Sequence, residues 1–542
     1  MAAGWAGLCL HGAVRADPAP APGSDARTLL RDNNERLREE IDTLRLRQLQ
    51  RGSAVTPPPE QAASEPGNEC LPVTAVRIEG VTLLSRSELA TVPVPRQNCF
   101  SRAELQRILH DLHALYLARG YIEARVLPEA PRYGVLTLRV IEGRLEKIAG
   151  APGAASWLFP GLIGQAVNIR DLEQGLDQAN RLQSERMRAE ILPGEQLGGS
   201  NLFLTDAALS PWHGAVSLTN AGYDSTGRTD AALSLGRDNL TGRYDYLNLA
   251  LERSQGPARH SVRGSMFYSI PLGYWTGSAF YSQSTYLNTQ PLVFNTVELS
   301  GEAMQSGVRI DRVLSRGQTR IDSAYAQLAH KRVRNYFMGS QQDISSPSLT
   351  VLEAGLDRLV YFANGVWSLE MAVAQGVPWL GADRDTDSPY PDPPHAQFTK
   401  ARLSASWQQG GHSFVLDSRF VWQGCRQALP AIEQIELADN SMVRGFRHNG
   451  LSGETGWASH NTLSRPVALR GWLASPRLGL DVGRVLMRAS SQNYQSLAGG
   501  GVGLALSREG MTLDVEYSRP LYQPDGFAGE AHQVLARLSW QF

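Results

Sequence analysis

Residues 441–457, SMVRGFRHNGLSGETGW, carry an arginine and a phenylalanine in a segment whose glycines and asparagine are typical of a loop or hairpin tip. Val443 and Arg444 come before Gly445 and Phe446 follows it, so a guanidinium and a phenyl ring flank a flexible residue. A guanidinium fork matches a carboxylate and can bind one through two hydrogen bonds. These residues could therefore pair with a charge, in a binding loop, a catalytic loop or a latch tucked inside the protein.

A suitable carboxylate lies further along the chain, in RLGLDVGRVL (477–486). Alternate residues of a β-strand share a face, so Asp481 shares one with Gly479 and Gly483, opposite the leucines. A carboxylate framed by glycines leaves room for a bulky partner, and Arg444 could fold inward to reach it. The alternative is that Asp481 is one more polar residue of an inner face and Arg444 one more surface cation.

Motifs of enzyme chemistry are largely absent. The three lysines, Lys147, Lys331 and Lys400, do not follow a glycine, so there is no Walker A phosphate loop. The sequence has neither an HExxH zinc helix nor a GxSxG nucleophile elbow. The run AGGGVG (498–503) fails the GxGxxG spacing of a dinucleotide loop and predicts a turn entering a β-strand. We expect no enzymatic activity, no cofactor and no metal site.

Composition limits the classes of partner. The 542 residues carry a net charge of −1, with a pI of about 6.9, whereas a nucleic-acid-binding protein would show a basic field. No stretch approaches the roughly 18 apolar residues of a transmembrane helix. A transmembrane β-barrel remains possible, because its strands are short alternating segments with a much weaker signal.

The first residues and the cysteines bear on export. Residues 1–16 resemble the remnant of a secretory signal, although the basic n-region is missing; the alternative is a disordered apolar tail. Export would favour a disulfide between Cys70 and Cys99, which both belong to the first folded segment. Cys425 would then remain unpaired, near the end of a strand.

A charged helix and a linker are predicted before the first folded segment. Residues 27–51 are dense in helix formers, and Leu30, Leu37 and Leu44 recur every seven residues as a narrow apolar stripe. Two interpretations are open, a short coiled coil or a single helix resting in a polar cavity. Residues 52–69 are rich in proline, serine and glutamate and predict a linker.

Two small α+β units in tandem follow the linker. Residues 70–146 predict the order strand, helix, helix, strand, strand, with a capping box at Ser101 and Glu104. Residues 147–207 repeat a similar plan, which indicates an internal repeat.

Period-2 alternation replaces helical periodicity over residues 208–542. Aromatic residues gather near the segment ends, and the chain finishes on an alternating, aromatic-rich strand that ends at Phe542. This pattern favours a transmembrane β-barrel, and about 20 residues for each strand with its connection give roughly 16 antiparallel strands.

The segment VRGF, followed by LSGETGW, resembles the loop motif of two-partner secretion transporters, in the outer-membrane assembly and translocation superfamily. Further segments resemble the family in order along the chain: NIRDLEQGLDQANRL, ILPGEQLGGS, RDNLTGRYDYLNLALERS, YSIPLGYWTGSAFYS and GLDVGRV. The resemblance covers most of residues 70–542. It implies an N-terminal plug helix, two POTRA domains and a 16-stranded barrel in the outer membrane of a Gram-negative bacterium.

The resemblance also implies roles for individual residues. The VRGF loop would occlude the lumen between strands 11 and 12, with Arg444 latched to Asp481 and Gly483 as the glycine of the family's DxG motif. The periplasmic POTRA domains would capture an unfolded secreted partner, which an exposed sheet edge can bind as an added strand. The strand at residues 186–194 is our candidate edge.

Three functions are compared. The first is ATP-independent export of a large exoprotein with an N-terminal secretion domain: an adhesin, a hemolysin or a contact-dependent inhibition toxin. The second is a barrel-assembly insertase of the same superfamily, and the third is a passive pore or an adhesion scaffold. Expected partners also include outer-membrane lipid and the barrel assembly machinery, which would act on Phe542. We expect some porin activity and no nucleic-acid partner.

Overall fold

The computed structural model describes most of the chain. It describes residues 24–542 except for 51–54, 57–69, 72, 93–99, 152, 208, 292–294, 318, 387–392, 412, 439–441, 448–449, 489–492 and 528. The predicted signal remnant, most of the predicted linker and Cys99 lie outside the described residues, so the Cys70–Cys99 disulfide stays a prediction.

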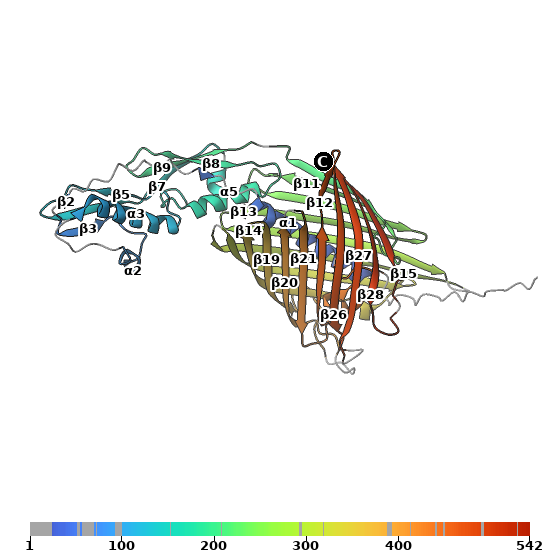
Figure 1. Ribbon diagram of the computed structural model, residues 1–542. Coiled ribbons are helices and arrows are strands. Elements are labelled where there is room, and N and C mark those ends of the chain that lie inside the picture. Colours follow the sequence, from blue (N-terminus) through green and yellow to red (C-terminus); the bar gives the residue numbers. More distant parts are fainter. Residues whose placement is uncertain are drawn as a thin grey trace, which may run out of the picture.

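A closed antiparallel barrel forms the C-terminal part of the protein (Figure 1). Its sixteen long strands, all within the described residues, are β10 (Trp212–Thr219), β11 (Thr229–Asp238), β12 (Tyr246–Gly256), β13 (Arg259–Leu272), β14 (Trp275–Pro291), β15 (Thr296–Arg316), β16 (Arg320–Phe337), β18 (Ser348–Phe362), β19 (Gly365–Val377), β20 (Thr399–Gly410), β21 (Val415–Cys425), β24 (Thr455–Ser464), β26 (Trp472–Leu486), β27 (Gln495–Arg508), β28 (Met511–Tyr522) and β29 (Gln533–Gln541). Two short strands, β17 (Ser340–Gln341) and β25 (Val467–Leu469), extend hairpins, and β29 pairs with β10 to close the ring. The predicted fold class is confirmed.

The barrel strands alternate as a lipid-facing wall requires. In β28, Leu513, Val515 and Tyr517 are exposed, and Glu516 between them is buried inside. In β26, Leu480 is exposed and the next residue, Asp481, is fully buried. An apolar outer face with a polar interior is the pattern of outer-membrane barrels.

No helix among the described residues has both the length and the apolar character needed to cross a membrane.

Two α+β units precede the barrel. The first contains β2 (Cys70–Leu71), β3 (Ala75–Glu79), α2 (Arg86–Leu89), β4 (Phe100–Ser101), α3 (Arg102–Ala118), β5 (Arg125–Pro128) and β6 (Val135–Ile141), and the second contains β7 (Arg144–Ala149), α4 (Ala154–Trp157), α5 (Ile169–Asn180), β8 (Arg188–Pro193) and β9 (Gly199–Thr205). The strands order β3-β6-β5 in the first unit and β8-β9-β7 in the second. The capping box at Ser101 and Glu104 starts α3. β2 pairs with β4, which places Cys70 opposite Ser101.

A short strand within the linker extends the sheet of the second unit. β1 (Val55–Thr56) pairs in parallel with β8, with Val55 opposite Ala189 and Thr56 opposite Glu190. The chain itself therefore covers the edge of β8, where we expected a secreted partner to add a strand. Two residues without an apolar period carry no strand signal, so the sequence did not predict this pairing.

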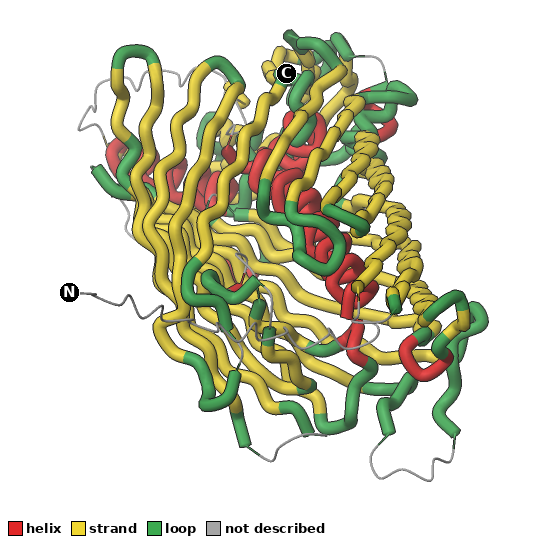
Figure 2. The backbone as a smooth tube through the Cα atoms, turned by 90° about the vertical axis from the view of Figure 1, so that its right-hand side faces the viewer, coloured by secondary structure: helices red, strands yellow, loops and turns green. Residues whose placement is uncertain are grey.

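The N-terminal helix α1 (Ser24–Gln50) runs through the inside of the barrel (Figure 2). Near its start, Ala26, Leu29 and Leu30 pack in a small cluster with Tyr286 and Val333 of the barrel wall. Its charged faces meet the polar lumen. The interpretation as a single helix in a polar cavity is therefore correct, and the coiled coil is wrong.

The second α+β unit, the helix and the barrel share one apolar core. Leu44 of α1, Leu176 of α5 and Phe267 of β13 belong to the same buried cluster. Buried Arg181 donates hydrogen bonds to the Ser269 hydroxyl (2.6 Å) and to the carbonyl of Tyr244 (3.1 Å). This junction fixes the α+β unit against the mouth of the barrel.

The junction also contains a buried acid, Glu185. Burial and the neighbouring Asp206 carboxylate raise the pKa of Glu185 to about 8, and Asn239 donates a 3.2 Å hydrogen bond to it. An unfolded glutamate titrates near pH 4.3, so the folded state holds an extra proton between these two pKa values. The stability of the junction should therefore be greatest below about pH 4.3, fall as pH rises toward 8, and level off above it.

We predict that Glu185→Gln removes this fall, because the amide cannot ionise, and that the variant is more stable than the parent chain at about pH 8 to 9. The measurement is hydrogen exchange of residues 183–206 in the detergent-solubilised chain across this pH range. Glu190→Gln, on an exposed position of β8, is the matched control and should follow the parent. Identical profiles for Glu185→Gln and the parent would contradict the prediction.

Candidate functional site

The loop that carries VRGF folds into the barrel. Between β21 and β24 the chain forms a 3-10 turn, η2 (Ala431–Glu433), and then a small hairpin of β22 (Ile435–Leu437) and β23 (Leu451–Gly453). Val443 and Phe446 are buried in one cluster with Leu437 of the hairpin and Leu497 of the wall. The apolar residues of the loop are thus buried against the wall and the hairpin, which explains why a loop carries them.

Arg444 and Asp481 lie in contact, both almost inaccessible to solvent. The backbone N–H of Arg444 donates a 2.9 Å hydrogen bond to Oδ2 of Asp481. The guanidinium Nε also lies 2.9 Å from Oδ2, but this N–H is not aimed at the oxygen, so the side-chain contact is an ion pair without a hydrogen bond. The structure therefore joins the two residues through charge and backbone together.

Neighbouring groups complete the surroundings of this pair. Nη2 of Arg444 lies 2.7 Å from Nε2 of His460 and donates a 3.0 Å hydrogen bond to the hydroxyl of Thr462. The second oxygen of Asp481 accepts a 3.1 Å hydrogen bond from the backbone of Asn461 and lies 3.1 Å from Nδ1 of His460. Both carboxylate oxygens are thus occupied, as a buried charge requires.

Glycines of the barrel wall make room for Arg444. A Cβ at Gly479 would overlap the guanidinium, and a Cβ at Gly499 would overlap the carbonyl of Arg444. Gly499 belongs to the AGGGVG run, which we predicted to be a turn entering a β-strand. The predicted turn is wrong, because the whole run lies within the strand β27, directly opposite β26, with Gly499 paired to Asp481.

The remaining motif residues have separate contacts. Gly445 has a φ of +92°, and a Cβ there would lie 2.6 Å from the backbone of Arg519, so only glycine fits this turn. Phe446 packs edge-on against Phe527, with ring centroids 6.1 Å apart. Gly483 faces the loop, because a Cβ there would lie 2.6 Å from the side chain of Leu437.

Sequence reasoning missed Arg447, the residue after the motif. Its Nε donates a 2.7 Å hydrogen bond to the carbonyl of Gly222, and its Nη2 donates a 2.6 Å bond to the carbonyl of Asn220. These carbonyls belong to the connection between β10 and β11. Arg447 therefore attaches the loop to the wall next to the β10–β29 pairing that closes the barrel. A cation next to VRGF is the only sequence signal of this role, and it is a weak one.

Charge pairs also hold α1 in the lumen. Arg45 contacts Asp311 and Asp357 at 2.7 and 2.8 Å. Asp32 pairs with Arg263, and Arg36 pairs with Glu252. At the loop base, Arg31 and Arg27 lie 3.1 and 3.6 Å from Glu436 of β22. The helix is therefore attached both to the wall and to the inward loop.

This arrangement can hold or release an obstruction in the lumen. Groups of three or more His, Cys, Asp or Glu side chains that could hold a metal ion do not occur among the described residues. Removing one partner of a buried ion pair costs about 3–5 kcal/mol, and water in a lumen reduces that cost. Such contacts are strong enough to favour one closed state and weak enough to be exchanged.

A closed barrel whose lumen holds a helix and an inward loop, behind two α+β units, defines a plugged transport barrel of the outer membrane. The family model described as haemolysin secretion/activation protein ShlB/FhaC/HecB matches residues 198–506. The chain therefore belongs to this family, the outer-membrane transporters of two-partner secretion, with its α+β units in the periplasm. These units match the models of a ShlB-type POTRA domain (residues 71–143) and a POTRA domain (136–193).

Relatives cover nearly the whole chain. Hemolysin transporter protein ShlB of Serratia marcescens is 38% identical over 96% of this chain and 94% of its own length. Hemolysin transporter protein HpmB of Proteus mirabilis is 36% identical over 92% of this chain and 90% of its own. The solved structure of CdiB from Escherichia coli superposes with a TM-score of 0.86 at 29% identity, over 96% of this chain and 99% of that one.

Because a side chain at Gly479 would displace the guanidinium, we predict that Gly479→Ala opens the pore more often than the parent chain, by about tenfold. The measurement is single-channel recording in planar bilayers. Gly264→Ala is the matched control, since a Cβ at this β13 glycine meets no atom within 4 Å. Equal opening frequencies for Gly479→Ala and Gly264→Ala would show that the space for Arg444 at Gly479 does not control opening.

Proposed function

We propose that this chain exports a large hemolysin-type exoprotein through its barrel, and that α1 and the VRGF loop are the two elements that clear the pore. The observation that carries the proposal is the filled lumen, since both elements are held to the wall by exchangeable charge pairs. The names of the relatives at 38% and 36% identity support a hemolysin-type cargo. A contact-dependent inhibition toxin is the second candidate, supported by the fold shared with CdiB.

The Arg444–Asp481 contact is the latch of the loop in this proposal. The loop approaches the wall by its backbone and its guanidinium together, so movement of Arg444 away from the wall would break both contacts. The polar lumen offers water and the neighbouring Glu516, 3.8 Å from Nε, as alternative partners for the released arginine. Opening would therefore exchange charge partners and leave no isolated charge.

The driving force does not need a nucleotide. An unfolded cargo that folds outside the cell cannot easily return, so its folding biases movement outward. The family consists of transporters, and relatives matched over nine-tenths of the chain are named as hemolysin transporters. These findings support export over the insertase and over the passive pore.

The periplasmic units would receive the cargo first. A strand can be added to a sheet edge through main-chain hydrogen bonds. The edge of β8 has the required backbone, and β1 already pairs with it in this way. We propose that the cargo takes this edge after β1 leaves. We also propose that the units end at residues 146 and 207.

The lipid and the insertion machinery complete the proposed partners. Trp540 and Phe542 are about half exposed, with ring centroids 5.1 Å apart, at the end of the last strand. Aromatic side chains at that position suit the membrane interface. We propose that the barrel assembly machinery acts on this C-terminal end.

Reversing either charge of the latch should abolish its attraction. We predict that Arg444→Asp or Asp481→Arg alone lowers secretion of the exoprotein by about tenfold or more, and that the double swap recovers part of it. The measurement is exoprotein in the culture medium, normalised to folded barrel. The control is Arg358→Asp with Asp322→Arg, a pair on the wall strands β18 and β16 whose arginine is about half exposed. Full secretion by both single variants would show that secretion does not depend on the Arg444–Asp481 latch.

Deleting residues 27–51 should raise the conductance of the chain in planar bilayers several-fold, because α1 fills the lumen and its removal leaves a water-filled path. A chain that begins at residue 24 and keeps the helix is the control. The same conductance with and without the helix would place the resistance elsewhere in the pore.

A further inference from the structure

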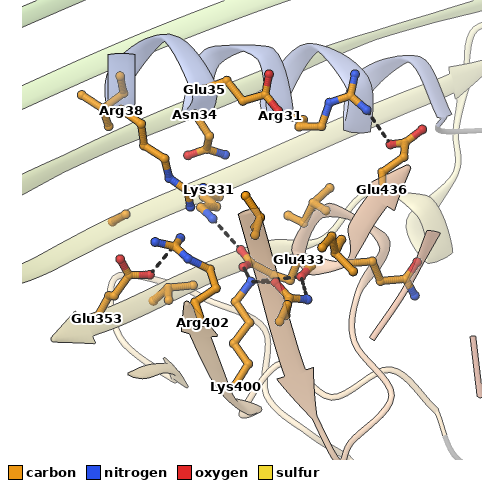
Figure 3. Close-up of a pocket in the computed structure, with 18 of the residues that line it drawn as sticks. Arg31, Asn34, Glu35, Arg38, Lys331, Glu353, Lys400, Arg402, Glu433 and Glu436 are labelled. Atoms are coloured by element: carbon orange, nitrogen blue, oxygen red, sulfur yellow. Dashed lines mark hydrogen bonds and ion pairs between the residues drawn. The ribbon is translucent and has the colours of Figure 1, made fainter. Parts of the chain in front are cut away.

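Two of the three lysines in the chain converge on one carboxylate. Lys331 lies in β16 and Lys400 in β20, and both reach Glu433 of η2, at the base of the VRGF loop (Figure 3). The chain has 49 arginines and only three lysines, so the choice of lysine for both partners of one carboxylate needs a reason. Glu433 is 3% exposed, so its charge depends on these two partners.

The contacts use the geometry of an ammonium group. Nζ of Lys331 donates a 2.6 Å hydrogen bond to Oε1 of Glu433. Nζ of Lys400 donates to Oε2 (2.8 Å), to the backbone carbonyl of Glu433 (3.0 Å) and to Gln423 (3.3 Å). Three acceptors around one compact cation match its three N–H donors, whereas a planar arginine fork would not. Gln423 also donates a 3.0 Å bond to the Glu433 carbonyl, so the backbone is held with the side chain.

The base and the tip of the loop are attached to different parts of the wall. Glu433 is bound by β16, β20 and β21, whereas Arg444 is bound by β26 and contacts β24. The contacts of one anchor include no residue of the other. The tip can therefore leave its site without breaking any hydrogen bond or ion pair of Glu433.

The base also carries α1. Ile432 packs against the apolar cluster at the start of the helix. Glu436 pairs with Arg31 (Figure 3) and lies 3.6 Å from Arg27. A cavity of about 130 Å³ lies between the helix, η2 and the wall, and Lys331, Lys400 and Glu433 line it. The docking surface for the start of the helix is therefore built on the segment that the two lysines hold.

We propose that Glu433, held by Lys331 and Lys400, is a positioning residue that fixes the loop base, so that the base stays as a seat for α1 when the Arg444 end of the loop moves. This deepens the proposed function and rests on it, because it takes the Arg444 end as the moving part. It assigns the three residues a role separate from the latch. The base thereby offers α1 the same docking surface each time the pore closes.

The loss of the Glu433 charge has a second effect that favours movement. Without it, two ammonium groups face each other across the site, close to Arg402. Arg402 is already paired with Glu353 and Glu370, at 3.4 and 2.7 Å. Repulsion between uncompensated cations would then push the lysines apart, and the base would lose its anchor.

The test compares thiol labelling at two buried positions of the same apolar cluster, one in the base and one in the tip. Ile435→Cys reports the base and Met442→Cys reports the tip, in a chain with Cys425→Ser. Arg444→Ala releases the tip without any cargo. Bilayer-incorporated chains are treated with a small charged thiosulfonate reagent, and folding is checked by heat-modifiable gel mobility.

With Arg444→Ala, labelling at position 442 should rise about tenfold, and labelling at position 435 should rise much less, because the tip leaves the shared cluster while the base stays on the wall. Adding Glu433→Gln should raise labelling at position 435 by a similar factor. Glu353→Gln is the matched control, because Glu353 is also a buried carboxylate beside the same cavity but lies on the wall strand β18. It should leave position 435 protected.

Two results would overturn the proposal separately from the latch. Equal acceleration at both positions while Glu433 is intact would show that the base moves with the tip. Equal effects of Glu433→Gln and Glu353→Gln would show that the lysine pair has no special role. No acceleration at position 442 would instead contradict the latch itself, and with it the movement of the tip relative to the base.

Discussion

The closed state of this transporter depends on the requirement that charges buried in the lumen be paired. Arg444 and Asp481, Glu433 with its two lysines, and the arginines of α1 with wall carboxylates all satisfy it. Buried ion pairs are nearly balanced between desolvation and attraction, so they specify a geometry more than they add stability. A plug held by apolar packing alone would expose its core to water on leaving, whereas a charged plug exchanges one polar environment for another.

The wall has adapted to the loop by losing side chains. Gly479 and Gly499 face Arg444, and Gly483 faces Leu437, so the inner surface of β26 and β27 is a mould of the loop. This explains why a carboxylate framed by glycines was informative in the sequence. The site therefore fits this loop because two adjacent strands lack side chains there, and Asp481 supplies the charge.

Much of the architecture could be predicted, since alternation in β-strands and periodicity in helices are local signals. The same alternation placed Asp481 inside and Leu480 outside before any partner was known. The family resemblance then supplied the plug and the loop. The long-range contacts were beyond reach: Glu433 lies 102 residues from Lys331 in the chain, and nothing local relates them. AGGGVG was misread because consecutive glycines are typical of turns, whereas here Gly499 makes room for the backbone of Arg444.

The pairing of β1 with β8 sets a limit on how far the helix can travel. Gln50 ends α1 and Val55 begins β1, so five residue steps of at most about 3.6 Å keep the helix end within about 18 Å of the sheet edge. Even a swing from one extreme to the other moves that end by about 36 Å, and the 27-residue helix is about 40 Å long. While β1 stays paired, the short segment between α1 and β1 therefore limits how far the helix can move. Detaching β1 lengthens it to the whole stretch before Cys70, so occupation of one periplasmic strand edge and emptying of the pore become a single mechanical event.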